Sequence, residues 1–126
     1  MSTQGAPIVY LVDDDSAVRD SLRVMLEAYG MVVKDYVSAP AFLADGERRH
    51  GCLILDLHMP EMSGLELLEV LREQGSELPV IVFTGRGDAD LKERVEQAGA
   101  LALFAKPVDV DALVQTIERA LAPKVA

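Results

Sequence analysis

Five short apolar runs, rich in β-branched residues, alternate along this chain with longer segments in which apolar residues recur at helical spacing. The runs occupy residues 8–12, 31–36, 53–55, 80–83 and 101–104. This alternation is typical of consecutive β-α units, and right-handed crossovers between parallel strands place helices on both faces of an open sheet. The sequence therefore predicts a doubly wound α/β fold with a five-stranded parallel sheet and five helices.

The apolar character of each run predicts its place in the sheet. Four runs are continuously apolar, as expected of parallel strands buried on both faces, whereas the run at 31–36 alternates at its end and suits an edge. Open sheets of this kind bind ligands outside the carboxyl ends of their strands. A functional site is therefore expected at those ends.

Polar residues and glycines mark the expected limits of the helices. The residues predicted to cap helix N-termini with a side-chain oxygen are Ser16, Ser38, Ser63 and Asp109. The glycines expected where helices stop are Gly30, Gly75 and Gly99. The helix at 88–98 sets few apolar residues against a largely charged surface, so we expect it to be the least firmly packed.

The length of 126 residues fits one domain, and a hydrophobic content of 50% supports a single core without disulfides. We expect this core to span about residues 7–121, with 122–126 as a tail or linker stub. The single cysteine, Cys52, lies in an apolar run, which predicts a buried structural thiol and a reducing, cytoplasmic setting. No segment resembles a signal peptide or a membrane span, so no membrane association is expected.

The acidic balance of the chain excludes one class of partner. With 12 basic and 21 acidic residues the net charge is -9, which opposes binding to nucleic acid or to anionic lipid. Any influence on DNA is therefore expected to be indirect.

Three consecutive carboxylates, Asp13, Asp14 and Asp15, directly follow the first apolar run. Like charges about 5 Å apart repel by roughly 3 kcal/mol at an effective dielectric constant near 20, and a shared divalent cation relieves that repulsion. Hard oxygen ligands favour Mg²⁺, which keeps several waters and completes its shell with phosphate oxygens. The alternative is a solvated acidic turn that caps a helix, in which Asp15 serves only as a cap.

Three further polar residues stand at the ends of later strands: Asp56 after the third run, Thr84 after the fourth and Lys106 after the fifth. Each is an ordinary residue when taken alone. Together with the acidic cluster they form a set suited to phosphoryl transfer, which depends on positioning and on neutralising the phosphoryl oxygens. Mg²⁺, Lys106 and the Thr84 hydroxyl would each hold one oxygen, and Asp56 would be the in-line nucleophile.

The loop after Asp56 contains Pro60 and Gly64, which we expect to shape it. Proline fixes one backbone torsion, and glycine permits conformations that other residues avoid.

These motifs resemble the receiver domains of bacterial two-component response regulators over nearly the whole chain. The matching segments are Leu-Val-Asp13-Asp14-Asp15 followed by Val18-Arg19, Leu-Ile-Leu-Asp56-Leu-His-Met-Pro60-Glu-Met-Ser-Gly64, Val-Ile-Val-Phe-Thr84-Gly85, and Lys106-Pro107. The resemblance implies a flavodoxin-like sheet with strand order 2-1-3-4-5. It also implies that the peptide bond between Lys106 and Pro107 is commonly cis.

The resemblance further implies the roles of the site residues. Asp56 would accept a phosphoryl group from a histidine kinase, a phosphotransfer protein or a small acyl phosphate, and the domain would catalyse its own phosphorylation and dephosphorylation. The implied Mg²⁺ ligands, with Mn²⁺ as a substitute metal, are Asp13, Asp14, Asp56 and the main-chain carbonyl of His58. Thr84 would turn toward the phosphoryl group and Lys106 would pair with it.

The segment from Thr84 to Asp88 resembles receivers joined to helix-turn-helix transcription domains, which implies control of transcription through a downstream partner and dimerisation on phosphorylation. A surface around the helix at 88–98 and the fifth strand is the expected site of the conformational response.

Two features depart from the family pattern or remain without a role in it. The switch aromatic of the family corresponds to Leu103, whereas Phe104 should point the other way by strand alternation. We expect Leu103 to fill the same half-buried place. His58 and Arg86, each two residues beyond a site residue, are candidates for controlling access of water; a metal-binding or phosphate-carrying role for His58 is the alternative to an exposed loop histidine.

Two other functions fit part of the pattern. A haloacid-dehalogenase-like phosphatase also uses an aspartate nucleophile, Mg²⁺, a hydroxyl and a lysine, but it requires a second acid where this chain has His58, and the chain has no room for a cap domain. A pseudo-receiver that only binds protein partners should have lost part of the acidic site, and none of it is missing.

Overall fold

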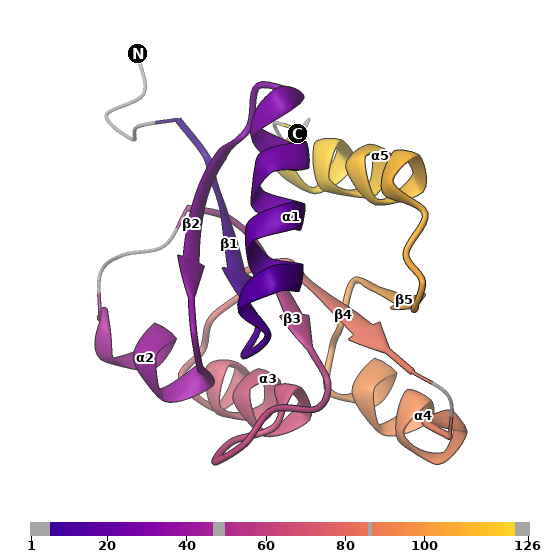
Figure 1. The fold of residues 1–126 in the computed structure, drawn as a ribbon. Helices are drawn as coiled ribbons and strands as arrows, with labels where there is room; N and C mark the ends of the chain where they lie inside the picture. The colour runs from indigo at the N-terminus through magenta and orange to yellow at the C-terminus, as the bar shows by residue number, and fades with distance from the viewer. Residues whose placement is uncertain (1–5, 47–49, 86, 123–126) are drawn as a thin grey trace.

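A computed structural model describes residues 6–46, 50–85 and 87–122, which form five alternating strands and helices (Figure 1). The strands are β1 (Ile8–Val12), β2 (Val32–Tyr36), β3 (Gly51–Asp56), β4 (Val80–Thr84) and β5 (Ala102–Ala105). The helices are α1 (Ser16–Ala28), α2 (Ala39–Ala44), α3 (Gly64–Glu73), α4 (Ala89–Gln97) and α5 (Val110–Leu121). The strands form one sheet in the order β2-β1-β3-β4-β5, and each neighbouring pair is parallel, which confirms the predicted fold.

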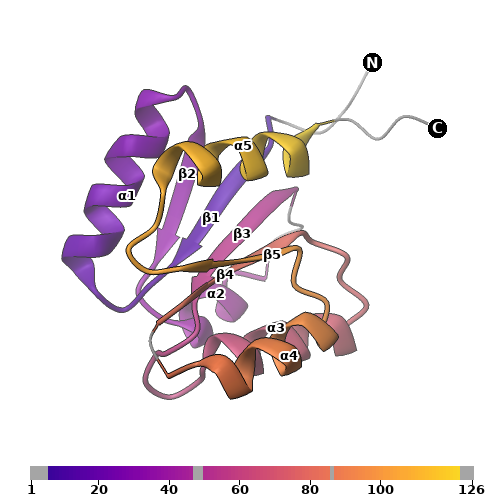
Figure 2. The same cartoon turned by 90° about the vertical axis from the view of Figure 1, so that its right-hand side faces the viewer.

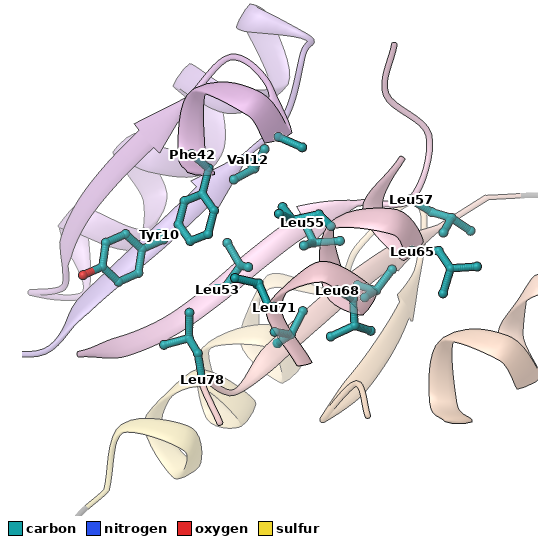
Figure 3. Packing of buried hydrophobic residues seen from close by; sticks show 14 of the residues in the cluster. Tyr10, Val12, Phe42, Leu53, Leu55, Leu57, Leu65, Leu68, Leu71 and Leu78 are labelled. Carbon is teal, nitrogen blue, oxygen red and sulfur yellow. The ribbon is translucent and has the colours of Figure 1, made fainter. Parts of the chain in front are cut away.

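The helices form two layers on the sheet: α1 and α5 cover one face, and α2, α3 and α4 cover the other (Figure 2). Because side chains alternate along a strand, β3 sends Ile54 to the first layer and Leu53 and Leu55 to the second. Figure 3 shows Leu55 facing Leu68 of α3 in the second layer. Two apolar cores therefore hold the sheet from both sides.

The edges of the sheet are less buried than its centre. β2 alternates between exposed and buried positions, as predicted for an edge strand. The expectation that the run at 101–104 is buried on both faces was wrong. β5 forms the other edge and is half-buried, with Ala105 exposed, because it has a strand neighbour on one side only.

Three of the four predicted N-caps are confirmed: Ser38, Ser63 and Asp109 accept hydrogen bonds from backbone amides of α2, α3 and α5. The prediction of Ser16 was wrong by one position. Asp15 is extended and its carboxylate accepts from the amides of Ala17 and Val18, so Ser16 is the first helical residue. The glycines expected at helix ends, Gly30, Gly75 and Gly99, all have positive φ angles.

Helix α4 is the most weakly packed of the five, as predicted. Val95 is its only buried residue, whereas α3 buries five and α5 buries four. The helix therefore has little apolar surface holding it to the sheet.

Two other expectations concern burial and membranes. Cys52 is fully buried, and burial raises the pKa of its thiol to about 12, as expected for a structural cysteine. Among the described residues no helix is both long enough and apolar enough to cross a bilayer. Of the predicted tail at 122–126, only Ala122 falls within the described residues.

Candidate functional site

The carboxyl ends of β1 and β3 bring three carboxylates together. These strands are neighbours, with Val12 paired to Leu55, so the residues that follow them share one edge of the sheet. Carboxylate oxygens of Asp13, Asp14 and Asp56 lie within 4.8 Å of one another. The structure therefore joins the three predicted acidic residues in one crevice.

Asp13 is the most deeply buried member of this acidic cluster. Only 1% of it is exposed, and while its Oδ1 accepts a 2.9 Å hydrogen bond from the Asp15 amide, its buried Oδ2 has no partner. Burial raises the pKa of Asp13; the hydrogen bond from Asp15 opposes that rise, and the charge of Asp56 adds to it. A hard divalent cation would satisfy the unpartnered oxygen and offset the repulsion, so the donor set fits Mg²⁺.

Lys106 supplies a cation to the same crevice. Its Nζ lies 2.9 Å from Oδ2 of Asp56. Partial burial lowers the pKa of Lys106, but the hydrogen bond and charge of Asp56, with Asp13 adding to them, raise it above the ordinary value overall. Lys106 therefore stays protonated beside Asp56, and the peptide bond that joins it to Pro107 is cis, as expected.

Thr84 ends β4 and brings a hydroxyl to the neighbouring strand end. It is 1% exposed, and its Oγ1 has no hydrogen-bond partner. In the described part of the chain, the only buried side-chain polar atoms without a partner are this hydroxyl and Oδ2 of Asp13. Buried polar groups are almost always paired, so two unpaired groups at the same edge of the sheet indicate a place for a ligand.

The loop between β3 and α3 is shaped differently from the expectation. The positive φ angle of 69° belongs to Glu61, not to Gly64. Gly64 is needed for space, because a Cβ there would lie 2.5 Å from the backbone oxygen of Asp56 and 2.5 Å from Leu55 Cδ1. The start of α3 thus packs directly against the backbone of the acidic residue.

A link between this loop and α4 was missed from the sequence. The amide of His58 lies 3.4 Å from Oδ1 of Asp56, and its ring Nε2 lies 2.6 Å from Oδ1 of Asp88. The other carboxylate oxygen of Asp88 accepts a 2.5 Å hydrogen bond from the Gly85 amide, which lowers the pKa of Asp88, and the bond to His58 lowers it further. In the sequence Asp88 stands out only as the start of a helix, and no spacing rule points to His58.

His58 is thus exposed but paired, with 63% of its side chain accessible. Its predicted companion at the rim, Arg86, lies outside the described residues.

Arg19 is a second residue without a role in the sequence argument. Its guanidinium donates a 2.7 Å hydrogen bond to the main-chain oxygen of Asp13 and a 3.0 Å bond to Asp35 on β2. It therefore fixes the backbone that carries the first acidic residue. The sequence contained it only as part of the Val18-Arg19 motif.

Leu103 and Phe104 point to opposite faces of β5, as strand alternation predicted. Leu103 packs with the layer of α3 and α4, and Phe104 packs with the layer of α1 and α5. Leu103 is half-buried and lines, with Thr84 and residues of α4, a hollow of about 520 Å³. Thr84 and Leu103 therefore border the same space.

The fold and the site together define a doubly wound α/β domain with an acidic cluster that can hold a metal ion at the carboxyl edge of its sheet. The chain belongs to the response regulator receiver domain family, whose model matches residues 9–118. The resemblance stated from the sequence is confirmed. Membership of this family argues against the alternative of a phosphatase of the haloacid dehalogenase type.

Curated relatives agree with this assignment. The chain is 43% identical over 115 residues to the response regulator protein TmoT of Ectopseudomonas mendocina, covering 90% of this chain and 52% of that protein. It is also 43% identical over 113 residues to the transcriptional regulatory protein FixJ of Rhizobium meliloti, covering 89% of this chain and 55% of the relative. The chain therefore spans about half the length of the curated relatives that it matches.

Solved structures share the fold. A crystal structure of FixJ-N has a TM-score of 0.87 and 41% identity, covering 98% of this chain and 99% of that one. A structure of the response regulator StyR has a TM-score of 0.85 and 39% identity, covering 93% of this chain and 60% of that one.

Proposed function

We propose that this chain is a phosphorylation-driven switch in which Asp56 accepts a phosphoryl group from a phosphohistidine of a histidine kinase or phosphotransfer protein. The observation that carries the proposal is the set of groups that surround Asp56. Its carboxylate contacts Lys106, lies within 4.8 Å of two other carboxylates, and stands at the same sheet edge as the buried Thr84 hydroxyl, which has no partner. Phosphoryl transfer needs this combination of nucleophile, cation, donor and metal ligands.

Asp13, Asp14, Asp56 and the main-chain oxygen of His58 would hold the metal ion in this site. When bound, Mg²⁺, or Mn²⁺ in its place, neutralises charge on the phosphoryl oxygens and on the acidic cluster. The buried Oδ2 of Asp13 has no hydrogen-bond partner, so a cation would satisfy it.

In the transfer step a carboxylate oxygen of Asp56 attacks the phosphorus atom of the donor. A new O–P bond forms, the P–N bond of the phosphohistidine breaks, and its electron pair returns to the imidazole nitrogen. Lys106 would pair with one phosphoryl oxygen and the Thr84 hydroxyl would donate a hydrogen bond to another. Attack of water on the same phosphorus would later restore the carboxylate and release inorganic phosphate.

The donor has to approach Asp56 over the surface around the crevice. An apolar groove of about 450 Å³ opens beside Lys106 between α1 and the segment that leads into α5. It is lined by Val18 and Met25 of α1, both partly exposed, and by Pro107 and Val110. A helix that carries the phosphohistidine and presents apolar residues beside it is the partner that this groove fits.

The response would appear at α4 and β5. A phosphoryl group shifts a conformational equilibrium only if it stabilises one state more than the other. Thr84 and Leu103 line the same hollow under α4, so a Thr84 hydroxyl that turns toward the phosphoryl group changes the space available to Leu103. The changed surface would control a downstream partner in transcription, and it would serve for dimerisation.

The test is incubation with a small acyl phosphate and Mg²⁺, followed by mass spectrometry of the intact chain. We expect the wild type and Asp20→Asn, which alters an exposed aspartate of α1, to gain one phosphoryl group. The Asp56→Asn variant should gain none. Equal labelling of Asp56→Asn and the wild type would overturn the proposal.

A second measurement tests the switch. Beryllium fluoride with Mg²⁺ imitates the phosphoryl group, and we expect it to perturb amide signals from Gly85 to Lys106. If the changes are limited to the loops that carry Asp13 and Asp56, the proposed response at α4 and β5 is wrong, although Asp56 could still accept a phosphoryl group.

A further inference from the structure

The N-terminus of α4 differs from that of every other helix in the described chain. The helices α1, α2, α3 and α5 each have a cap residue whose side chain accepts a hydrogen bond from a backbone amide of the helix. The cap residue of α4 is Asp88, a residue type well suited to capping, yet it makes no such bond. The missing capping hydrogen bond needs a physical reason.

The reason is that the Asp88 carboxylate is engaged elsewhere. One oxygen lies 2.6 Å from Nε2 of His58, and the other accepts the 2.5 Å hydrogen bond from the Gly85 amide. The backbone matches this alternative use: φ and ψ of Asp88 are -91° and 10°, whereas the four caps that work are all extended. Asp88 is 3% exposed, so this position is well enclosed.

The same contacts connect α4 to the acidic crevice. The His58 amide lies 3.4 Å from Oδ1 of Asp56, so one residue faces Asp56 with its backbone and Asp88 with its ring. The Gly85 amide directly follows Thr84 in the chain. Asp88 therefore joins the two loops that flank the predicted phosphoryl position.

We infer that Asp88 is a positioning residue with two alternative places: the bridge between His58 and Gly85 seen here, and the N-cap of α4. This inference rests on the proposed function for its trigger, because phosphorylation replaces the single negative charge of the Asp56 carboxylate with a phosphoryl group of about 1.5 to 2 negative charges beside His58. That charge repels the Asp88 carboxylate, and its oxygens compete for the donors that now hold Asp88. Released from the bridge, Asp88 caps the weakly packed α4 and stabilises it.

The competing explanation is that the bridge is only a tie that keeps α4 in place. The two explanations predict opposite signs for one variant. His58→Ala removes the ring but keeps the main chain that faces Asp56. If the bridge is a tie, α4 loosens and its amides exchange faster with solvent. If the bridge withholds a cap, Asp88 keeps only the Gly85 amide as a bridge partner, moves more readily to the cap, and α4 is protected.

The experiment is amide hydrogen exchange, resolved by residue, on the chain without any phosphoryl donor. We expect His58→Ala to slow exchange in the first turn of α4 by about fivefold, which corresponds to the gain of one ordinary N-cap. The double variant His58→Ala with Asp88→Ala should lose that gain. Faster exchange in His58→Ala, or unchanged protection in the double variant, overturns the inference.

Beryllium fluoride with Mg²⁺ then tests the trigger. In the wild type it should slow exchange at the start of α4, and in Asp88→Ala it should still shift the signals of Asp56 and Thr84 without protecting α4. Equal protection of α4 in both proteins contradicts the role of Asp88. A wild type whose Asp56 signals do not respond contradicts the proposed function instead, while the result for His58→Ala still decides whether Asp88 has two places.

Discussion

Helices α3 and α4 follow neighbouring strands that each end in a site residue, but the two helices are held very differently. α3 begins with a capping box between Ser63 and Glu66 and buries five residues against the sheet. α4 has no side-chain cap and buries only Val95. Asp56 thus precedes a firmly anchored helix, and Thr84 precedes a loosely anchored one.

This contrast indicates that the side of the site with Asp56 and α3 is rigid, whereas the side with Thr84 and α4 is able to move. Catalytic groups must be held in place by packed surroundings, so a nucleophile belongs on the rigid side. Segments that move are drawn from the least stable parts of a fold, so a response belongs on the other side. Asp56 lies on the central strand β3, whereas Leu103 and α4 lie toward the edge formed by β5.

The largest expected difference comes from the same substitution in both helices. Leu68 of α3 is fully buried, and Leu91 of α4 is only partly buried. Leu68→Ala should lower the free energy of unfolding by about 3 kcal/mol, because it removes a buried side chain and leaves a cavity. Leu91→Ala should lower it by less than about 1.5 kcal/mol, since less apolar area is lost.

Urea denaturation of the two variants beside the wild type measures both values. Equal losses would mean that α4 is anchored as firmly as α3, and the contrast between the two sides would fail.

The two loops that lead into these helices offer a second pair. A Cβ on Gly64 would lie 2.5 Å from the backbone oxygen of Asp56, so Gly64→Ala should cost about 2 to 3 kcal/mol through overpacking. A Cβ on Gly87 would meet nothing within 4 Å, although its φ is 84°. Gly87→Ala should therefore cost only about 1 kcal/mol, the strain of a left-handed alanine.

Thermal unfolding separates these outcomes, and phosphorylation by an acyl phosphate adds a functional measure. Gly64→Ala should also slow labelling of Asp56, whose backbone it displaces. A Gly64→Ala protein as stable as Gly87→Ala would show that the loop before α3 yields as easily as the loop before α4.

Repulsion between the carboxylates of Asp13 and Asp56 destabilises the metal-free fold, and Asp13→Asn should relieve it. Burial and the charge of Asp56 raise the pKa of Asp13, so the metal-free fold is strained when both are ionised. Asparagine keeps the oxygen that accepts from the Asp15 amide and removes the charge. The metal-free variant should gain roughly 1 to 2 kcal/mol of stability, part of the repulsion between like charges about 5 Å apart.

Titration with Mg²⁺ completes this test. The melting temperature of the wild type should rise with Mg²⁺, as expected when a ligand binds the folded state, and that of Asp13→Asn should not. A variant that is less stable than the wild type without metal would show that the acidic cluster is not strained.

The sequence predicted the framework because periodicity, caps and strand-end residues all agree with one topology. The five apolar runs located the strands, and the carboxyl ends of adjacent strands brought Asp13, Asp14 and Asp56 together. What could not be predicted depends on where side chains meet in space. The bridge from His58 to Asp88 joins residues 30 positions apart across two loops, and no local pattern encodes it.

The errors have a similar origin. Ser16 was a reasonable cap by residue type, but Asp15 adopts the extended conformation that capping requires. Gly64 was assigned a conformational role, whereas the left-handed residue of the loop is Glu61 and Gly64 serves close packing. Residue type predicts what a position is able to do, and the tertiary contacts decide which of those options is used.

The smallest effect tests the capping difference directly. The Ser63 hydroxyl accepts from the Glu66 amide at 3.1 Å, and the Glu66 carboxylate accepts from the Ser63 amide at 3.0 Å. Ser63→Ala should cost about 1 kcal/mol, the usual value of an N-cap, while Ser21→Ala on the exposed part of α1 should change stability by less than about 0.5 kcal/mol. If amide exchange in α3 of Ser63→Ala remains slower than in α4 of the wild type, packing rather than capping holds α3. If the protection of α3 against amide exchange falls to the level of α4, the cap alone accounts for the difference between the two helices. Moving Asp88 into the α4 cap would then be enough to protect α4 as α3 is protected in the wild type.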